Sequence, residues 1–250
     1  MKTAEYEITF PKLRKMLEQN EEWIILDGEN GRTKLKLHDY GRIYSVPGLY
    51  EEIFYNRLKC DSPNVVGTML AEELEKMKDA PAELRVLDFG AGNGMVGECL
   101  KEKVECSSMV GIDIIPEAMH AAWRDRPDVY DVYYVMDLNN LNKKEEETLK
   151  DWDFNTLVTV AALGFEDIPT FAFVNAFNII EKGGLVAFNI KTKFLMDEDK
   201  TGFHEILDRM FDSCLKVVNS KKYCHRYSLT GDKIYYQAIV GRKLKDAHIS

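Results

Sequence analysis

The residues best suited to chemistry lie in one segment, which runs from Val86 to Gly97 and reads VLDFGAGNGMVG. An apolar run enters a glycine-rich turn, and a helical pattern follows. Glycine allows a positive φ and lets a ligand approach the main chain closely. Such a turn between a strand and a helix is a typical nucleotide-binding place. Gly92, Gly94 and Gly97 match Gly-x-Gly-x-x-Gly, a pattern that is weak evidence when taken alone.

Three aspartates strengthen the pattern. Asp88 precedes the turn, Asp113 ends the next apolar run, and Asp137 ends the one after it. Because ligands of doubly wound sheets bind at the carboxyl ends of the strands, these carboxylates should meet beside the turn. Asp113 is placed to accept from both ribose hydroxyls, and Asp137 from an adenine amino group, with the Leu138 N–H near a ring nitrogen. Each aspartate could instead be an ordinary turn or helix-cap residue.

From about residue 84 to 190, and on to 242 through its last two strands, the chain resembles the class I S-adenosylmethionine-dependent methyltransferase family. That family has an acid two positions before the first glycine of the turn, as Asp88 stands before Gly90. The resemblance implies that the turn and its acid bind the methionine part of the cofactor and that Ile114 packs on the adenine. The cofactor-binding residues so implied are Asp88, Gly90, Ala91, Gly92, Asn93, Gly94, Asp113, Ile114, Asp137, Leu138 and Ala161.

An aromatic group in the N-terminal part offers a cover for this site. Tyr50 and Phe54 are four residues apart and share a helix face. In many members of the family an N-terminal segment with Tyr and Arg folds over the cofactor, and Tyr50, Tyr55 and Arg57 resemble that arrangement. Such a lid would exclude water and hold the methyl group near its acceptor. Ordinary core packing is the other interpretation of these rings.

Several functions share this pattern. A nicotinamide-dependent oxidoreductase also uses a glycine turn, but Asp88 would repel its pyrophosphate, and little chain remains for a second catalytic domain. A protein that binds the cofactor without catalysis fits the same residues, and an RNA or protein acceptor stays open. We predict an S-adenosylmethionine-dependent methyltransferase that acts on a small molecule. An inactive binding protein and an NAD(P)-dependent oxidoreductase are the alternatives.

No catalytic residue is assigned, because a cofactor that carries an activated methyl group needs mainly an aligned acceptor. Residues 161–167 read AALGFED and lack the Asn-Pro-Pro-Tyr or Asp-Pro-Pro-Tyr segment of members that methylate bases and amides. Phe165, Glu166, Phe194 and His204 are candidates for the acceptor pocket, although His204 could simply be solvated or cap a helix. No set of metal ligands is evident, and no metal is expected.

The elements that must position these residues alternate between strands and helices from residue 84 onward. Apolar runs typical of buried strands are 84–89, 109–113, 132–136, 155–160 and 185–190. They predict a parallel sheet covered on both faces. The runs 215–220 and 234–242 are joined too closely for a helical crossover and should be antiparallel. The expected fold class is α/β, with a doubly wound, mostly parallel seven-stranded Rossmann-like sheet that ends in an antiparallel hairpin.

The first 64 residues do not follow this pattern, and we expect an N-terminal extension at 1–64 and a methyltransferase domain at 65–250. A short helix is expected at 11–19. Two apolar runs joined by a turn with Gly and Asn, at 27–31, predict a β-hairpin. The hairpin could serve as a flap or as an arm that forms a homodimer.

The composition of the chain limits the kinds of partner that we expect. The formal net charge of −9 repels phosphate backbones, so nucleic acid is not an expected partner. No apolar run approaches the roughly 20 residues that cross a bilayer, so no membrane is expected either. The 5 cysteines are irregularly spaced, which favours reduced thiols, and the first residues lack a secretory pattern. We expect a soluble, cytoplasmic protein.

Overall fold

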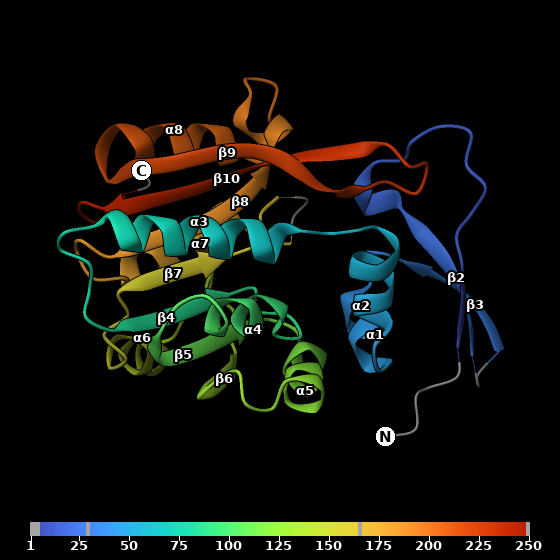
Figure 1. Cartoon of the computed structure of the whole chain (residues 1–250), viewed down its shortest axis with the longest axis horizontal. Coiled ribbons are helices and arrows are strands. Elements are labelled where there is room, and N and C mark those ends of the chain that lie inside the picture. Colours follow the sequence, from blue (N-terminus) through green and yellow to red (C-terminus); the bar gives the residue numbers. More distant parts are fainter. Residues whose placement is uncertain (1–5, 29–30, 165–166, 249–250) are drawn as a thin grey trace.

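The computed structural model of the chain describes residues 6–28, 31–164 and 167–248 and contains a seven-stranded sheet (Figure 1). The strand order is β6-β5-β4-β7-β8-β10-β9. Strands from β6 to β8 are parallel, while β10 runs antiparallel to both β8 and β9. The bounds are β4 Leu84–Phe89, β5 Cys106–Asp113, β6 Val132–Val135, β7 Thr156–Thr159, β8 Leu185–Lys191, β9 Leu215–Tyr227 and β10 Lys233–Lys243. The predicted fold class is confirmed.

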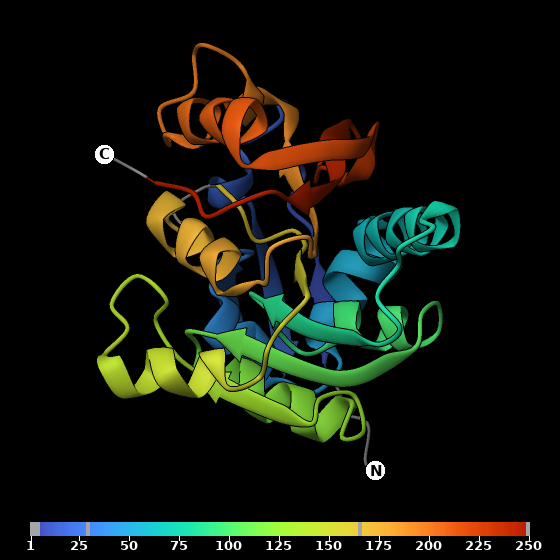
Figure 2. The same ribbon diagram turned by 90° about the vertical axis from the view of Figure 1, so that its left-hand side faces the viewer.

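Helices cover both faces of this sheet, as the edge-on view shows (Figure 2). One face packs against α3 (Ser62–Lys76), α4 (Met95–Lys101) and α5 (Pro116–Asp125), and the other against α6 (Lys143–Lys150), α7 (Thr170–Ile179) and α8 (Phe203–Ser213). Successive strand side chains point to opposite faces. In β4, for example, Val86 packs in the first apolar layer, between the sheet and α3, α4 and α5. Leu87 packs in the second apolar layer, between the sheet and α6, α7 and α8.

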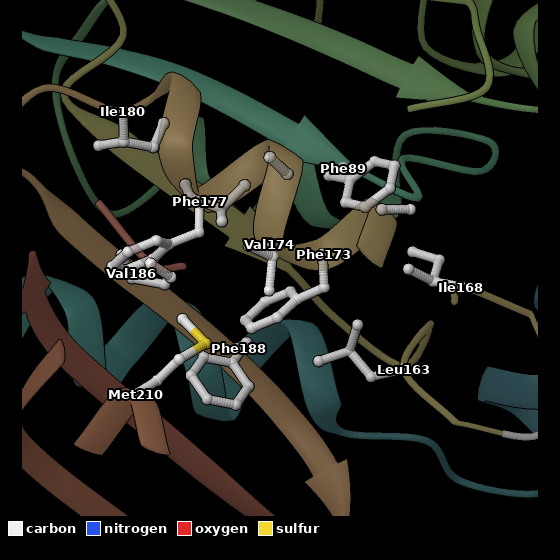
Figure 3. Packing of buried hydrophobic residues seen from close by; sticks show 14 of the residues in the cluster. Phe89, Leu163, Ile168, Phe173, Val174, Phe177, Ile180, Val186, Phe188 and Met210 are labelled. Atoms are coloured by element: carbon white, nitrogen blue, oxygen red, sulfur yellow. The ribbon is translucent and has the colours of Figure 1, made fainter. Parts of the chain in front are cut away.

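The second layer is rich in aromatic rings. Phe173 and Phe177 of α7 lie against Val186 and Phe188 of β8 (Figure 3). The rings of Phe173 and Phe188 are 5.3 Å apart between centroids. This packing makes the sheet and its helices one rigid support for the turns that follow the strands.

The chain reverses its direction of winding at β4. β5 and β6 lie on one side of β4, whereas β7 and β8 lie on the other. Ligands of open α/β sheets bind at such a reversal, outside the carboxyl ends of the strands. The strand order alone therefore points to the end of β4, where the glycine turn begins.

The N-terminal segment stands beyond those strand ends (Figure 1). Its elements are β1 (Glu7–Thr9), the 3-10 turn η1 (Gln19–Glu21), β2 (Trp23–Gly28), β3 (Gly31–Lys36), α1 (Tyr40–Ser45), α2 (Leu49–Glu51) and η2 (Glu52–Arg57). The predicted hairpin is confirmed, since β2 pairs antiparallel with β3, and β1 adds a third strand. Residues 29 and 30 of its turn lie outside the described part of the chain. The buried face of the hairpin packs on its own chain, through Ile24 and Leu35.

The helix expected at 11–19 is wrong. Residues 11–18 form no helix, and only η1 winds briefly after them. Gln19 and Glu22 are buried and hydrogen-bond to Tyr236 and Arg226 near the far end of the chain. These tertiary contacts determine the path of this segment and override its local helix propensity.

One turn of the N-terminal segment is a π-helix. In η2 the N–H of Leu58 donates to the carbonyl of Ile53, five residues back, at 3.0 Å. π-helical turns are rare and often lie at functional sites. This turn carries Phe54, which belongs to the buried apolar cluster of the segment.

None of the helices in the described part of the chain combines the length and apolar character needed to cross a bilayer.

Candidate functional site

A cavity of about 130 Å³ lies at the carboxyl ends of β4, β5, β6 and β7, and we call it the first chamber. The turns after these strands form its floor and sides. Its lining residues are Tyr40, Tyr44, Tyr50, Phe89, Gly90, Asp113, Ile114, Ile115, Met136, Asp137, Leu138, Val160, Ala161, Ala162, Asp167, Ile168, Pro169 and Ala172. The three tyrosines come from the N-terminal segment, which thus closes the chamber from above the strand ends.

The charges in this lining have one sign. Asp113, Asp137 and Asp167 contribute carboxylates, while the described lining contains no Lys, Arg or His. Opposite charges attract strongly where water is partly excluded. The first chamber therefore suits a cationic ligand and opposes a phosphate.

Asp113 is tied to the glycine turn. Its Oδ2 accepts from the Gly92 N–H at 3.0 Å and its Oδ1 from the Ile115 N–H at 3.1 Å. Burial raises the pKa of Asp113, and these two hydrogen bonds oppose that rise. A carboxylate offers about four lone-pair sites, so each oxygen can accept one further hydrogen bond from a ligand.

Beside it, Ile114 is 58% exposed, unusually open for a large apolar side chain, and it lines the first chamber. Asp137 also lines the first chamber and organises its own turn, since Oδ1 accepts from the Asn139 N–H at 2.9 Å and Oδ2 from the Asn140 amide at 2.7 Å. The Leu138 backbone lies in the same wall. The apolar surface and the carboxylates provide a place for a flat, polar-edged ring.

The glycine turn is conformationally special. Gly90, Gly92 and Gly94 have φ values of 76°, 54° and 87°, which L side chains rarely adopt. A Cβ on Gly92 would lie 2.5 Å from the Tyr44 hydroxyl. Glycine at this position therefore lets the N-terminal segment approach the turn closely.

Asp88 does not line the first chamber. It is fully buried below the turn, where its Oδ2 accepts from the Tyr130 hydroxyl at 2.7 Å and its Oδ1 has no partner among the described residues. Burial raises the pKa of Asp88 to about 7, and the Tyr130 hydrogen bond opposes the rise. Its neighbours make Asp88 a support for the turn.

A polar latch fastens the N-terminal segment to the turn. Glu51 Oε1 accepts from the Asn93 amide at 2.8 Å and from Arg126 at 2.8 Å. Arg124 donates to the carbonyl of Tyr44 at 3.0 Å. Because Asn93 belongs to the glycine turn, the latch couples the cover of the chamber to its floor.

The other residues predicted for the cofactor are placed as follows. Ala91 is buried within the turn, and Gly94 lies beside Arg126. Tyr55 packs on Tyr50 at 6.1 Å between ring centroids, outside the first chamber. Arg57 is exposed and pairs with Glu52 at 2.7 Å. Of the predicted set, the structure gathers Gly90, Asp113, Ile114, Asp137, Leu138, Ala161 and Tyr50 around the first chamber.

The candidates for the acceptor pocket lie elsewhere. Phe165 and Glu166 are outside the described residues. Phe194 is buried in the apolar layer that contains α7. His204 lies at the start of α8, with Nε2 3.1 Å from an Asp197 oxygen. Phe194 and His204 do not line the first chamber.

A second, smaller cavity of about 30 Å³ shares Tyr40, Tyr50, Ala161 and Asp167 with the first, and we call it the second chamber. Its other lining residues are Gln19, His38, Phe54, Cys60, Leu163, His225, Arg226 and Tyr236. None of these was predicted as a site residue. The chain brings most of them together from its two ends, so no local spacing signals the group as a whole. Phe54, Leu163 and Asp167 stood near predicted positions.

No protein-family model matches the chain, and no curated protein does. Solved structures resemble it in fold. The N-methyltransferase NodS from Bradyrhizobium japonicum, in complex with S-adenosylhomocysteine, superposes with a TM-score of 0.53 at 14% identity, over 82% of this chain and 96% of that one. A putative class I S-adenosylmethionine-dependent methyltransferase from Listeria monocytogenes gives 0.51 at 15% identity, over 76% and 62%.

A putative RNA methyltransferase from Pyrococcus horikoshii also gives a TM-score of 0.51, at 13% identity, over 74% of this chain and 87% of that one. The chain therefore has the fold of class I S-adenosylmethionine-dependent methyltransferases. These structural neighbours differ in their acceptors, so the fold leaves the acceptor of this chain open.

Proposed function

We propose that this protein is an S-adenosylmethionine-dependent methyltransferase that acts on a small molecule. The observation that carries the proposal is the first chamber itself, which has three carboxylates, no basic side chain among its described lining residues, and a place at the strand ends of a methyltransferase fold. S-adenosylmethionine carries a sulfonium, an ammonium group and one carboxylate, and no phosphate. Its net positive charge complements this lining.

Residues of the chamber fit the parts of that cofactor. Asp113 would hold the ribose hydroxyls, and the exposed Ile114 would pack on the adenine, whose edge would face Asp137 and the Leu138 backbone. The bound cofactor supplies a methyl group already activated by the sulfonium. The task of the chain is then to hold the acceptor in line and to keep water out.

The N-terminal segment supports a small acceptor. Tyr40, Tyr44 and Tyr50 cover the chamber, and the Glu51 latch holds this cover on the glycine turn. A folded RNA or protein would need an open path to the methyl group, and the net charge of −9 opposes RNA. The packing of the hairpin on its own chain gives no support to a homodimer, which was one of its two interpretations.

Calorimetric titration tests the proposal. We expect S-adenosylmethionine and S-adenosylhomocysteine to bind and NADH not to bind, because its pyrophosphate would meet the carboxylates. Asp113→Asn should weaken the binding of both sulfur nucleosides at least about tenfold, since hydrogen bonds to a charged group contribute about 1.5–3 kcal/mol each.

Asp151→Asn, at the exposed end of α6, is the matched control and should bind both nucleosides as the wild type does. Binding of NADH, or no binding of either sulfur nucleoside, would contradict the proposal. Methyl transfer to an acceptor then separates an active enzyme from a protein that only binds the cofactor.

A further inference from the structure

The second chamber adjoins the first but shares none of Ile114, Asp137 and Leu138, the residues proposed to hold the adenine. Ala161 and Asp167 line both chambers, and so do Tyr40 and Tyr50 of the N-terminal segment. Ala161 has a φ of 58°, rare for a residue with a Cβ, and its N–H donates to Asn189 Oδ1 at 2.6 Å. The wall between the chambers is thus held in a fixed, unusual conformation, as expected at a functional site.

A chain of hydrogen bonds runs from this wall to the far side of the second chamber. Because Asn189 Oδ1 accepts from Ala161, its amide nitrogen donates to the Tyr223 hydroxyl, at 2.5 Å. With Tyr223 as the donor to Ser62 and Ser62 as the donor to His225 Nδ1, both at 2.6 Å, each of the two hydroxyls accepts one hydrogen bond and donates one. Burial also lowers the pKa of His225 well below its usual value, so this ring carries no charge.

The only guanidinium in the described lining of the second chamber is neutralised. Arg226 pairs with Glu22, and their side chains are 2% and 1% exposed. Glu22 also accepts from the Leu229 N–H at 3.0 Å. Because Glu22 offsets the charge of Arg226, the pair attracts an anionic ligand only weakly.

Aromatic rings and one carboxylate complete the wall. Tyr40, Tyr50, Phe54 and Tyr236 all line the second chamber, and the rings of Tyr50 and Phe54 are 4.7 Å apart between centroids. Asp167 stands at the junction of the chambers, with both carboxylate oxygens 3.3 Å from His38 Nδ1. Aromatic faces and a carboxylate around a small space are the features that bind ammonium groups.

We propose that the second chamber receives the nucleophilic nitrogen of the acceptor and that the acceptor is a small primary or secondary amine, held by Asp167 and the aromatic rings. This inference rests on the proposed function, because it assumes that the methyl donor lies in the first chamber.

The reaction then balances as follows. The amine enters as an ammonium ion and gives one proton to the Asp167–His38 pair, which leaves a lone pair on nitrogen. That pair forms the bond to the methyl carbon, while the electrons of the breaking carbon–sulfur bond stay on sulfur. The products are an N-methylammonium ion and S-adenosylhomocysteine, and the proton held by the pair is released to water.

Three probes of equal length test the inference on the wild-type protein saturated with S-adenosylhomocysteine. They are butylamine, butanol and butyrate, titrated at pH 7.5 with ligand-detected NMR. We expect butylamine to bind at least tenfold more tightly than the alcohol or the carboxylate. Asp167→Asn should remove that advantage, whereas Asp197→Asn, an exposed carboxylate outside both chambers, should retain it.

Phe54→Leu provides a second variant, because Phe54 lines only the second chamber. It should weaken butylamine severalfold while the affinity for S-adenosylhomocysteine stays within threefold of the wild type. Equal binding of the three probes, a preference for butyrate, or an unchanged preference in Asp167→Asn would overturn the inference. If S-adenosylhomocysteine itself does not bind, the proposed function fails; if it binds but no amine preference follows, only the inference fails.

Discussion

The two chambers are built in different ways. The walls of the first come mainly from turns that directly follow β4, β5, β6 and β7, and their polar groups bond to backbone atoms close by, as Asp113 does to Ile115. The walls of the second combine residues from both ends of the chain with the segment that follows β7. Their polar groups pair over long sequence distances, as Glu22 does with Arg226. The first chamber is therefore a property of the sheet, and the second depends on the N-terminal segment being docked.

This difference matches the different roles of the two chambers in the proposed reaction, since the first would bind the cofactor and the second the acceptor. A cofactor that is the same for many enzymes fits a site made by the fold itself. An acceptor that differs from enzyme to enzyme fits a site made by an added segment, which can change without disturbing the sheet. The variants below probe this difference, in order of expected effect.

The largest effect is expected from the buried ion pair of the second chamber. Glu22→Ala leaves the Arg226 charge buried without its partner, which should lower the free energy of unfolding by about 3–5 kcal/mol in urea titrations. Glu52→Ala removes an exposed partner of Arg57 and should cost less than about 1 kcal/mol. Similar costs for the two variants would contradict the dependence of the second chamber on this pair.

The pH dependence of stability tests the role of Asp88, which lies buried beneath the first chamber. Its folded-state pKa of about 7 lies above the unfolded value of 3.8, so the unfolded state ionises first as pH rises. Asp88 should therefore contribute a fall in stability of about 4 kcal/mol between about pH 4 and pH 7, and Asp88→Asn should remove this contribution.

Tyr130→Phe sharpens the test of Asp88. This variant lacks the hydrogen bond that opposes the raised pKa, so the window of falling stability should extend to higher pH. Thermal unfolding across the pH range measures both variants. A pH dependence that is the same in the wild type and in Asp88→Asn would contradict the assignment.

Gly92 tests the contact between the two regions. Gly92→Ala should destabilise the protein by about 1–2 kcal/mol through its φ alone, and its Cβ would also displace Tyr44. Gly31→Ala, at a φ of 81° with no atom within 4 Å of the added Cβ, is the matched control for the backbone effect. Limited proteolysis should cut the N-terminal segment faster in Gly92→Ala than in Gly31→Ala, and equal rates would show that Tyr44 does not hold the cover.

The smallest effect is expected at the latch. Glu51→Gln weakens the bonds to Asn93 and Arg126 by about 1 kcal/mol, so S-adenosylhomocysteine should dissociate roughly fivefold faster. Glu52→Gln, one residue further on, touches only exposed partners and should leave the rate unchanged. Stopped-flow displacement measures both rates, and equal rates would show that the cover does not gate the first chamber.

Sequence alone predicted the first chamber far better than the second. Apolar runs with an aspartate or glycine at their ends indicate where strands stop, and parallel strands all stop at one edge, so Asp113, Asp137 and Gly90 could be placed together. The burial of Asp88 could not be foreseen, because its partner Tyr130 comes from a loop after α5.

The second chamber leaves no comparable trace in the sequence. Glu22 and Arg226 are 204 residues apart, and neither stands in a pattern that differs from a solvated charge. The helix expected at 11–19 failed for the same reason, since contacts with β9 and β10 determine the path of that segment. Long-range pairing of polar groups is a property of the folded packing, which periodicity does not encode.

The π-helical turn Glu52–Arg57 has a consequence for how such an acceptor site can evolve. A π-helical turn holds one residue more than an α-helical turn, so deleting a single codon here would restore the α-helix. The turn accommodates the extra residue locally, so the deletion would redirect the side chains of the turn itself while the segments on either side keep their places. Phe54 lies inside the turn, so the deletion would reshape the second chamber without substituting any of its residues. Changes in chain length by one residue are thus a route by which descendants of this gene could exchange one acceptor for another, while the cofactor site is inherited unaltered.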